Sequence, residues 1–287
     1  MPPSHPTLPS EADAESAVTV IASCGPLSEE AEAQPQPSDA GKVPRATEAA
    51  GARPGVQYRI APEMVAAVLL VVVSGLALSS TLARMAIVSV GPDQYRGLME
   101  IATRFDLDHE INIPTWYSSI SLMCCGFLLA MIAVARRQAG ARYVVHWGIL
   151  ALAFVYLSVD ETAVLHEILI VPLRRRLGTH GFLYFAWVIP ASVCVLAFAM
   201  AYVRFLLHLP RRTARWFVLA GALYVGGALG VELIGGACAD WYGFTSMRYL
   251  LAMTAEEVLE MLGIVVFIYA LLDYIRAHVG PCRVAVA

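Results

Sequence analysis

The sequence has few charged residues and no excess of positive charge. Asp, Glu, Lys and Arg make up 15% of its 287 residues, and the formal net charge at pH 7 is −3. Soluble domains contain about 25% charged residues, so the composition argues against an ordinary soluble globular protein. The slight negative balance also provides no electrostatic basis for binding nucleic acid.

The sequence also lacks the motifs of several enzyme classes. Its six cysteines form no C-x-x-C pair, so neither a disulfide framework nor a zinc ribbon is indicated. There is no P-loop and no G-x-S-x-G nucleophile turn. The H-E-x-x-H zinc motif is incomplete, because Ile170 follows His166 and Glu167 where the second histidine is required. The motifs alone therefore indicate no reaction type.

Long apolar runs are abundant, and 58% of the residues are hydrophobic. A run of about 20 apolar residues is long enough to cross the hydrocarbon core of a bilayer. Lipid offers no hydrogen-bond partners to the backbone, so such segments must be helices. The sequence predicts an all-α polytopic membrane helix bundle with six transmembrane helices, at about 62–84, 113–135, 143–173, 181–206, 215–236 and 254–275, and a polar insert at 88–111.

The segments outside the bundle differ from it in composition. Residues 1–58 are rich in Pro, Ala, Ser, Glu and Gly with almost no aromatics, which is typical of a disordered tail. We expect a membrane domain at 59–278 and a short C-terminal tail at 279–287. Trp116, Trp147 and Trp216 each lie near the start of a predicted span, as interfacial anchors do.

The arginines indicate the orientation. A cytoplasmic N-terminus places on the cytoplasmic side Arg53, Arg59, Arg136, Arg137, Arg142, Arg204, Arg211, Arg212, Arg215, Arg276 and Arg283. The opposite side receives Arg96, Arg104, Arg248 and the run 174–176. Because cytoplasmic loops carry an excess of Lys and Arg, we predict a multi-pass protein of the plasma (inner) membrane with both termini in the cytoplasm.

Ionisable residues within the predicted spans are the main functional signal, because such residues are costly in lipid. At about 1.5 Å per residue, Asp160 and Glu232 lie roughly 25 Å along their spans, at the same depth. The start of the last span and Arg84, an ion-pair candidate, belong to the same layer. The candidate site residues are Asp160, Glu161, His166, Glu167, Glu232, Glu256, Glu257 and Glu260.

Part of this set has an alternative interpretation as helix caps. The strings SVDE at 158–161 and TAEE at 254–257 match the capping box S/T-x-x-E. The third span would then stop near Leu157, and the last span would begin at the membrane interface. This interpretation accounts for Glu161, Glu256 and Glu257 but not for the other candidates. Separately, Gly226 and Gly230 form a G-x-x-x-G pattern that predicts close helix packing.

Three functions suit a buried cluster of this composition. The leading hypothesis is that the cluster binds a proton or cation and serves small-molecule or ion transport. The alternative is a metal-dependent enzyme that acts on a lipid or another apolar substrate and uses Fe, Zn or Mn. Its ligands would be His166, Glu167, Glu232 and Glu260, with Asp160 as general base. The third is a polar scaffold without a ligand. The expected partners are the lipid bilayer and a small molecule, ion or lipid.

Five strings in the sequence resemble those of a family of bacterial multi-pass membrane proteins with no established activity. They are NIPTWYSS (112–119), YLSVDETAVLHE (156–167), FAWVIP (185–190), GVELIGG (230–236) and EEVLEMLG (256–263), and the similarity covers about 90–275. The resemblance implies a membrane location and a helical architecture but no reaction. The motif residues that it implies here coincide with the eight candidate site residues.

Overall fold

The computed structural model describes residues 20–23, 61–90, 96–109, 111–280 and 283–286. The chain divides into two units, one formed by 59–279 and the other by the terminal segments 1–58 and 280–287. In the terminal unit, strand β1 (Val20–Ser23) pairs antiparallel with strand β2 (Arg283–Val286). The rest of the tail that we predict at 1–58 lies outside the described residues.

The described residues of the unit formed by 59–279 are mostly helical, and among them six helical segments are long and apolar enough to cross a membrane. The prediction of an all-α bundle with six candidate transmembrane helices is confirmed. The elements are α1 (Pro62–Val90), α2 (Arg96–Thr103), α3 (Ile113–Gln138), α4 (Val144–Ala163), the 3-10 turn η1 (Glu167–Leu169), α5 (Ile170–Leu177), the 3-10 turn η2 (Gly181–Leu183), α6 (Val188–His208), α7 (Arg211–Val225), the π-helical η3 (Gly226–Val231), α8 (Glu232–Tyr242) and α9 (Met247–His278). The elements α7, η3 and α8 together form one span, Arg211–Tyr242.

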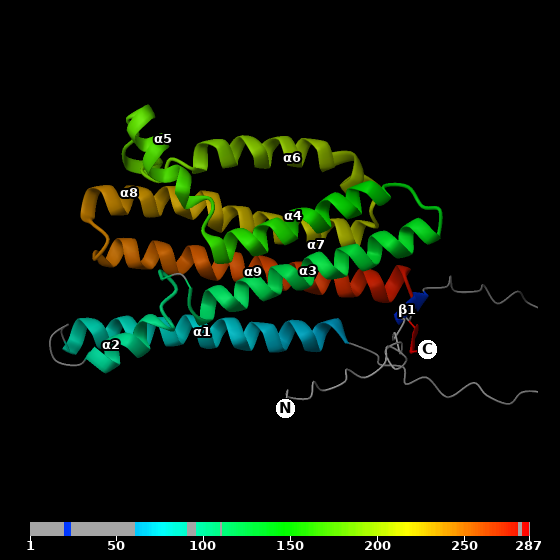
Figure 1. Cartoon of the computed structure of the whole chain (residues 1–287), viewed down its shortest axis with the longest axis horizontal. Helices are drawn as coiled ribbons and strands as arrows, with labels where there is room; N and C mark the ends of the chain where they lie inside the picture. The colour runs from blue at the N-terminus through cyan, green and yellow to red at the C-terminus, as the bar shows by residue number, and fades with distance from the viewer. Residues whose placement is uncertain (1–19, 24–60, 91–95, 110, 281–282, 287) are drawn as a thin grey trace, which may run out of the picture. The chain divides into compact units, whose positions relative to one another are not determined.

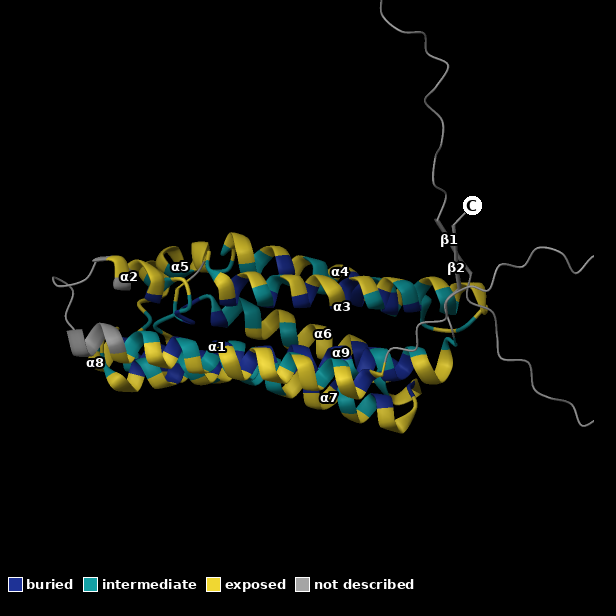
Figure 2. Ribbon diagram, turned by 90° about the horizontal axis from the view of Figure 1, so that it is seen from below, coloured by how far each residue is buried: buried dark blue, intermediate teal, exposed yellow. Residues whose placement is uncertain are grey.

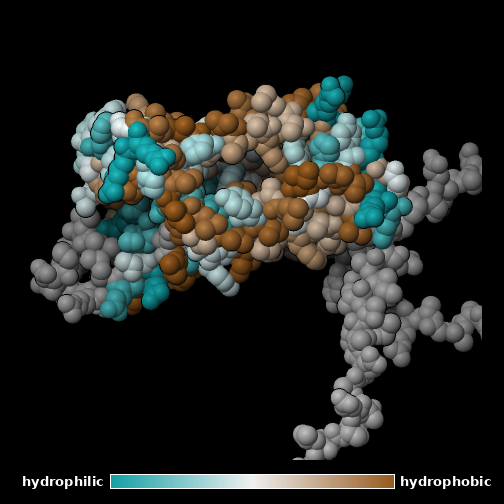
Figure 3. Space-filling model, turned by 45° about the horizontal axis from the view of Figure 1, so that its top comes forward, coloured by the Kyte–Doolittle hydropathy of each residue, from teal (hydrophilic) through white to brown (hydrophobic). Residues whose placement is uncertain are grey.

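The outer surface of the bundle is apolar. Large hydrophobic side chains such as Val71 and Leu207 are 73% and 81% exposed. Figure 3 shows a predominantly hydrophobic middle zone with hydrophilic side chains at both ends of the helical unit. A surface of this kind suits a lipid environment, because exposed apolar patches of this extent are rare on soluble monomers.

Helix α9 is the central element of the bundle. It packs against α1, α3, α7, η3 and α8, and Figures 1 and 2 show it running through the assembly with buried residues along much of its length. The largest core cluster groups its second half with Trp147, Leu122 and Phe205. Trp147 is therefore a core residue, and the prediction that it is an interfacial anchor is wrong.

Two glycines allow α9 to approach its neighbours closely. A Cβ at Gly263 would lie 2.7 Å from the Tyr224 backbone nitrogen and 3.0 Å from the Ala220 carbonyl oxygen. A Cβ at Gly227 would lie 2.8 Å from the Glu256 carbonyl oxygen. Any larger residue at these positions would push α9 away from α7 and η3.

The third span ends earlier than the sequence predicts. Helix α4 stops at Ala163, because Val164 adopts a left-handed conformation (φ 54°) and its N–H bonds the Asp160 carbonyl oxygen. The chain then continues through η1 into the separate helix α5, so the prediction of a continuous span to about 173 is wrong. The fourth span begins at Val188, which places Pro190 in the first turn of α6, where proline is tolerated.

Neither proposed capping box forms in the described helices. Ser158 lies inside α4, where its hydroxyl donates to the Ser119 carbonyl oxygen at 2.8 Å. Thr254 lies inside α9 and donates to the Leu250 carbonyl oxygen. Helix α9 begins at Met247, capped by the Ser246 hydroxyl. The glutamates that follow Thr254 are thus about 14 Å inside the helix rather than in its first turn.

Ion pairs join three helices at the end of the bundle where α9 terminates. The Asp273 carboxylate binds Arg212 of α7 at 3.0 Å and Arg276 of α9 at 2.8 Å. Arg276 also pairs with Glu63 of α1 at 3.0 Å. Asp273 is buried, so these arginines supply the countercharge that a buried carboxylate requires.

The contact at Gly263 predicts a loss of stability on substitution. We expect Gly263→Ala to lower the free energy of unfolding by about 1–3 kcal/mol, since its Cβ would overlap the α7 backbone. Gly221→Ala on α7, where a Cβ would meet no described atom within 4 Å, is the matched control. Thermal unfolding of the purified protein in detergent measures both effects. Equal unfolding midpoints for the two variants would contradict the close contact.

Candidate functional site

Asp160 and His166 form the first part of a polar cluster at the end of α4. Asp160 accepts a hydrogen bond from His166 Nδ1 at 2.9 Å and another from the His166 backbone N–H at 3.0 Å. Both contacts depend on the left-handed turn at Val164, which folds the chain back over the last turn of α4. The Asp160 carboxylate therefore determines both the position and the tautomer of the imidazole.

Trp187 connects this pair to Glu232. Its ring centroid lies 4.5 Å from that of His166, and its indole N–H donates to Glu232 Oε1 at 2.8 Å. Trp187 precedes α6 and Glu232 begins α8, so the contact joins segments 45 residues apart. An indole is only a donor, so Trp187 positions His166 and Glu232 and does not carry a proton between them.

Glu232 and Glu256 bring two carboxyl groups into contact. The two side chains lie close enough to interact electrostatically, and the residues are only 7% and 6% exposed. Glu256 Oε2 is buried and has no hydrogen-bond partner among the described residues. Ionised carboxylates only accept hydrogen bonds, so a direct hydrogen bond between these two groups would need a proton on one of them.

The π-helical segment η3 positions this pair. It directly precedes Glu232, and π-helical segments within α-helices are frequent at functional sites. Close approach to α9 occurs at Gly227, whose added Cβ would lie 3.0 Å from Glu260 Cγ. At Gly226 and Gly230, by contrast, a Cβ would meet no described atom within 4 Å. The tight contact in this region is thus one residue beyond the first glycine of the predicted G-x-x-x-G pattern.

Glu260 is a second acidic residue of the cluster on α9 and lies one helical turn after Glu256. Glu260 lies close to Tyr224 and interacts electrostatically with Glu161 and Glu257. Tyr224 in turn is close enough to interact with Asp160. Glu167 is exposed, although its charge acts on His166. The structure therefore gathers the eight candidates in one half of the bundle and leaves Glu167 at its edge.

The arrangement does not present a ready metal site. Within the described part of the chain, no group of three or more His, Cys, Asp and Glu side chains has a geometry that could hold a metal ion. Trp187 contacts both His166 and Glu232, and its indole N–H occupies one oxygen of the Glu232 carboxylate. These residues do not fit the ligand set that the metal-enzyme hypothesis requires.

Comparison with known protein families identifies the family of this chain. The model of the family described as Domain of unknown function (DUF8692) matches residues 64–275. The chain belongs to the DUF8692 family. Searches of curated proteins and of solved structures found no match. The DUF8692 region begins in α1, ends in α9 and contains the residues of the carboxylate cluster described above.

Arg84 of the DUF8692 region is not part of the carboxylate cluster. Its guanidinium donates to Asp106 at 2.7 Å and pairs with Asp108 at 3.1 Å. Tyr249 of α9 donates to Asp108 at 2.9 Å, and the Leu107 N–H donates to Ser80. This network attaches the connection between α2 and α3 to α1 and α9. The sequence predicts Arg84 as an ion-pair residue. Its partners, Asp106 and Asp108, lie in the polar insert rather than in the spans.

Sequence reasoning missed several of the residues that build the site. Asp106 and Asp108 lie in the segment 88–111, for which the sequence predicts only a polar insert. Trp187 and Tyr224 are aromatic residues in apolar runs, and no spacing pattern marks them as neighbours of Glu232 and Glu260. Trp187 does occur in the FAWVIP string, which is the one sequence signal for it.

The buried Arg84 network predicts a large effect of removing its cation. We expect Arg84→Gln to destabilise the fold by about 3–5 kcal/mol, because it leaves the buried Asp106 without a countercharge. Arg104→Gln, at an exposed position, should have little effect. Thermal unfolding in detergent checks both, and Arg84→Gln/Asp106→Asn should recover part of the loss. A double variant no more stable than Arg84→Gln would argue against the ion pair.

The surroundings of His166 predict a pH-dependent contribution to stability. Burial lowers its pKa, but the hydrogen bond and charge of Asp160, with the charges of Glu167 and Glu232, outweigh burial and raise the pKa. The imidazolium thus stabilises the fold fully below the unfolded-state pKa of about 6.5. This contribution is lost as the pH rises through the higher folded-state pKa.

Histidine NMR titration measures this shift directly, with the resonance assigned by His166→Gln. We expect a His166 pKa above the ordinary value, and a lower pKa in Asp160→Asn because the hydrogen bond and the negative charge are both lost. An unchanged His166 pKa in Asp160→Asn would contradict the assignment of Asp160 as its partner.

Proposed function

We propose that this protein is a plasma-membrane protein that binds protons at the Glu232–Glu256 pair and couples them to the transport of an ion or small molecule. One observation carries the proposal: two buried carboxyl groups from different spans lie close enough to interact strongly. Such a pair holds a proton in one state and, when that proton leaves, presents an uncompensated charge that attracts a proton or another cation.

The groups around the pair support a proton route. His166, which binds Asp160, interacts electrostatically with Glu232, and Glu260 interacts electrostatically with Glu232 and Glu257. Chains of Asp, Glu and His within spans are typical of pumps and transporters. Trp187 contacts both His166 and Glu232 but cannot relay a proton, so water or a moved side chain would complete the transfer between them.

The arginine distribution supports a cytoplasmic location for both termini. The end of the bundle with the connections 138–144 and 208–211 is rich in arginine, as the positive-inside rule expects of the cytoplasmic side. The carboxylate cluster would then lie in the half of the membrane that faces away from the cytoplasm.

Proton movement tests the proposal. We expect purified protein in liposomes loaded with a pH-sensitive dye to carry protons when a pH gradient is imposed. Glu232→Gln and Glu256→Gln should each reduce the rate at least tenfold, because an amide cannot release a proton. Glu100→Gln makes the same chemical change on the exposed surface of α2 and is the matched control. No proton flux, or equal flux in Glu256→Gln and Glu100→Gln, would contradict transport.

Two further measurements separate the competing functions. Infrared difference spectroscopy should show the carbonyl stretch of a protonated carboxyl group, and Glu256→Gln should abolish it. Elemental analysis of the same preparation tests the metal-dependent enzyme, since stoichiometric Fe, Zn or Mn that Glu232→Gln removes would favour it. If both variants change only thermal stability, the cluster is a polar scaffold.

A further inference from the structure

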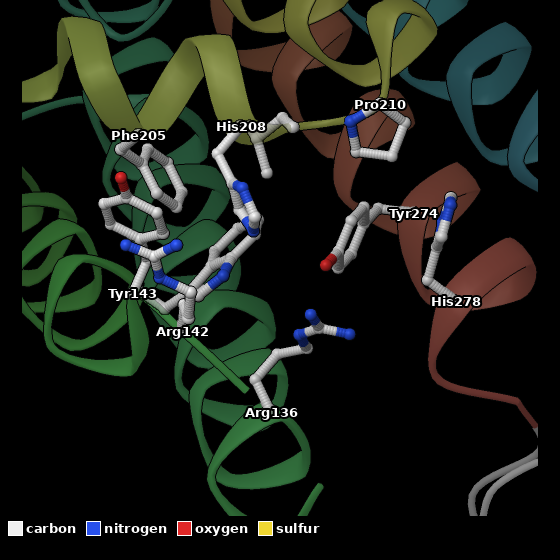
Figure 4. A pocket seen from close by; sticks show the side chains of 10 residues that line it. Arg136, Arg142, Tyr143, Phe205, His208, Pro210, Tyr274 and His278 are labelled. Atoms are coloured by element: carbon white, nitrogen blue, oxygen red, sulfur yellow. The ribbon is translucent and has the colours of Figure 1, made fainter. Parts of the chain in front are cut away.

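A separate cavity of about 160 Å³ lies at the opposite end of the helical unit from the carboxylate cluster. It is formed where α3 and α6 end, where α4 and α7 begin, and beside the last turns of α9. Figure 4 shows the side chains of Arg136, His208 and Tyr274 directed from different helices toward the same space. The proposed function does not use this cavity.

The polar lining of the cavity is basic. Arg136, Arg142, His208 and His278 contribute to it, and none of the described residues that line it is Asp or Glu. Asp273, which precedes Tyr274 in α9, is already engaged by Arg212 and Arg276. A concave site with cationic donors and no internal countercharge attracts an anion.

Arg136 has donor capacity that the protein leaves unused. Its Nε is buried and has no hydrogen-bond partner among the described residues. Buried polar groups are nearly always hydrogen-bonded, so an unpaired one in a cavity points to a missing partner. A guanidinium presents a planar fork of N–H donors that fits the oxygens of a phosphate group.

Aromatic rings make the walls of the cavity rigid. The Tyr143 ring centroid lies 4.9 Å from that of His208, and the Tyr274 ring stacks on His278 at 4.8 Å. The Arg142 guanidinium lies 5.7 Å from the Tyr143 ring centroid. The cationic groups are thus held in place before a ligand enters, which reduces the entropy lost on binding.

Two helix N-termini add positive potential. Helix α4 begins after Tyr143 and α7 begins after Pro210, both residues line the cavity, and neither helix has a side-chain cap. Unpaired N–H groups and the macrodipole favour anions at such ends. The C-terminal ends of α3, α6 and α9 also lie near the cavity, and helix C-termini favour cations. No described carbonyl oxygen at these ends accepts a hydrogen bond from Arg136 Nε.

We propose that this cavity binds a phosphate group, either on an anionic lipid or as free phosphate. Its volume is several times the roughly 30 Å³ of a water molecule, which allows a group of five heavy atoms. Arg136 would bind the phosphate oxygens through its guanidinium, with Arg142 and His208 completing the contacts. The terminal position of the cavity in the bundle, at the level of the last turns of three spans, also suits a lipid headgroup.

Binding to the delipidated full chain in detergent tests the proposal. The probes are phosphatidylglycerol, phosphatidylcholine and inorganic phosphate, measured by native mass spectrometry for the lipids and by equilibrium binding of radiolabelled phosphate. We expect Arg136→Gln and His208→Gln to weaken binding about tenfold or more, because each removes a donor to the phosphate. Arg137→Gln is the matched control, since Arg137 is the exposed neighbour on α3 and does not line the cavity.

The probes distinguish the two sources of phosphate. Retention of phosphatidylglycerol over phosphatidylcholine, without binding of inorganic phosphate, assigns the cavity to a lipid headgroup. Saturable binding of inorganic phosphate assigns it to a free phosphate. In either case the bound probe should raise the unfolding midpoint of the wild type and of Arg137→Gln but not that of Arg136→Gln.

Three results would overturn the proposal. One is that the wild-type protein neither retains phosphatidylglycerol over phosphatidylcholine nor binds inorganic phosphate. Another is that Arg137→Gln weakens binding as much as Arg136→Gln, which would indicate general attraction to a basic surface. The third is that Arg136→Gln and His208→Gln, both folded by circular dichroism, bind as tightly as the wild type.

Discussion

The contact between the Glu232 and Glu256 carboxyl groups is the interaction on which the rest of the polar architecture depends. Two buried carboxylates this close repel each other unless a proton or a cation compensates their charge. The surrounding structure holds the two carboxyl groups close together instead of letting them move apart. The π-helical η3 precedes Glu232, the glycine at 227 allows α9 to approach, and Trp187 binds the other side of Glu232.

The central position of α9 places different chemistry at the two ends of one helix. Its first half carries Glu256 and Glu260 into the acidic cluster, and its second half packs in the apolar core. Its final turns carry Asp273 and Arg276, which join α7 and α1, and His278, which lines the basic cavity. The acidic cluster and the basic cavity are therefore coupled to the same helix, so a movement of α9 would affect both.

The sequence predicted the helices well and their ends poorly. Apolar runs of about 20 residues are a strong signal, because the bilayer imposes both their length and their helical conformation. Where a helix stops depends on single residues. Val164 adopts a left-handed conformation that no β-branched residue prefers, and Thr254 matches a capping motif yet lies well inside α9. Local motifs cannot reveal such outcomes, since packing overrides them.

The sequence by itself determined that this chain is a multi-span membrane protein and that its spans carry ionisable side chains at one depth. Both follow from composition and from the fixed rise of a helix. Only the tertiary structure decided which groups meet: Arg84 with Asp106, Asp160 with His166, and Glu232 with Glu256. The rotation of each helix about its axis and the approach between helices decide such contacts, and these depend on side-chain packing across the whole bundle.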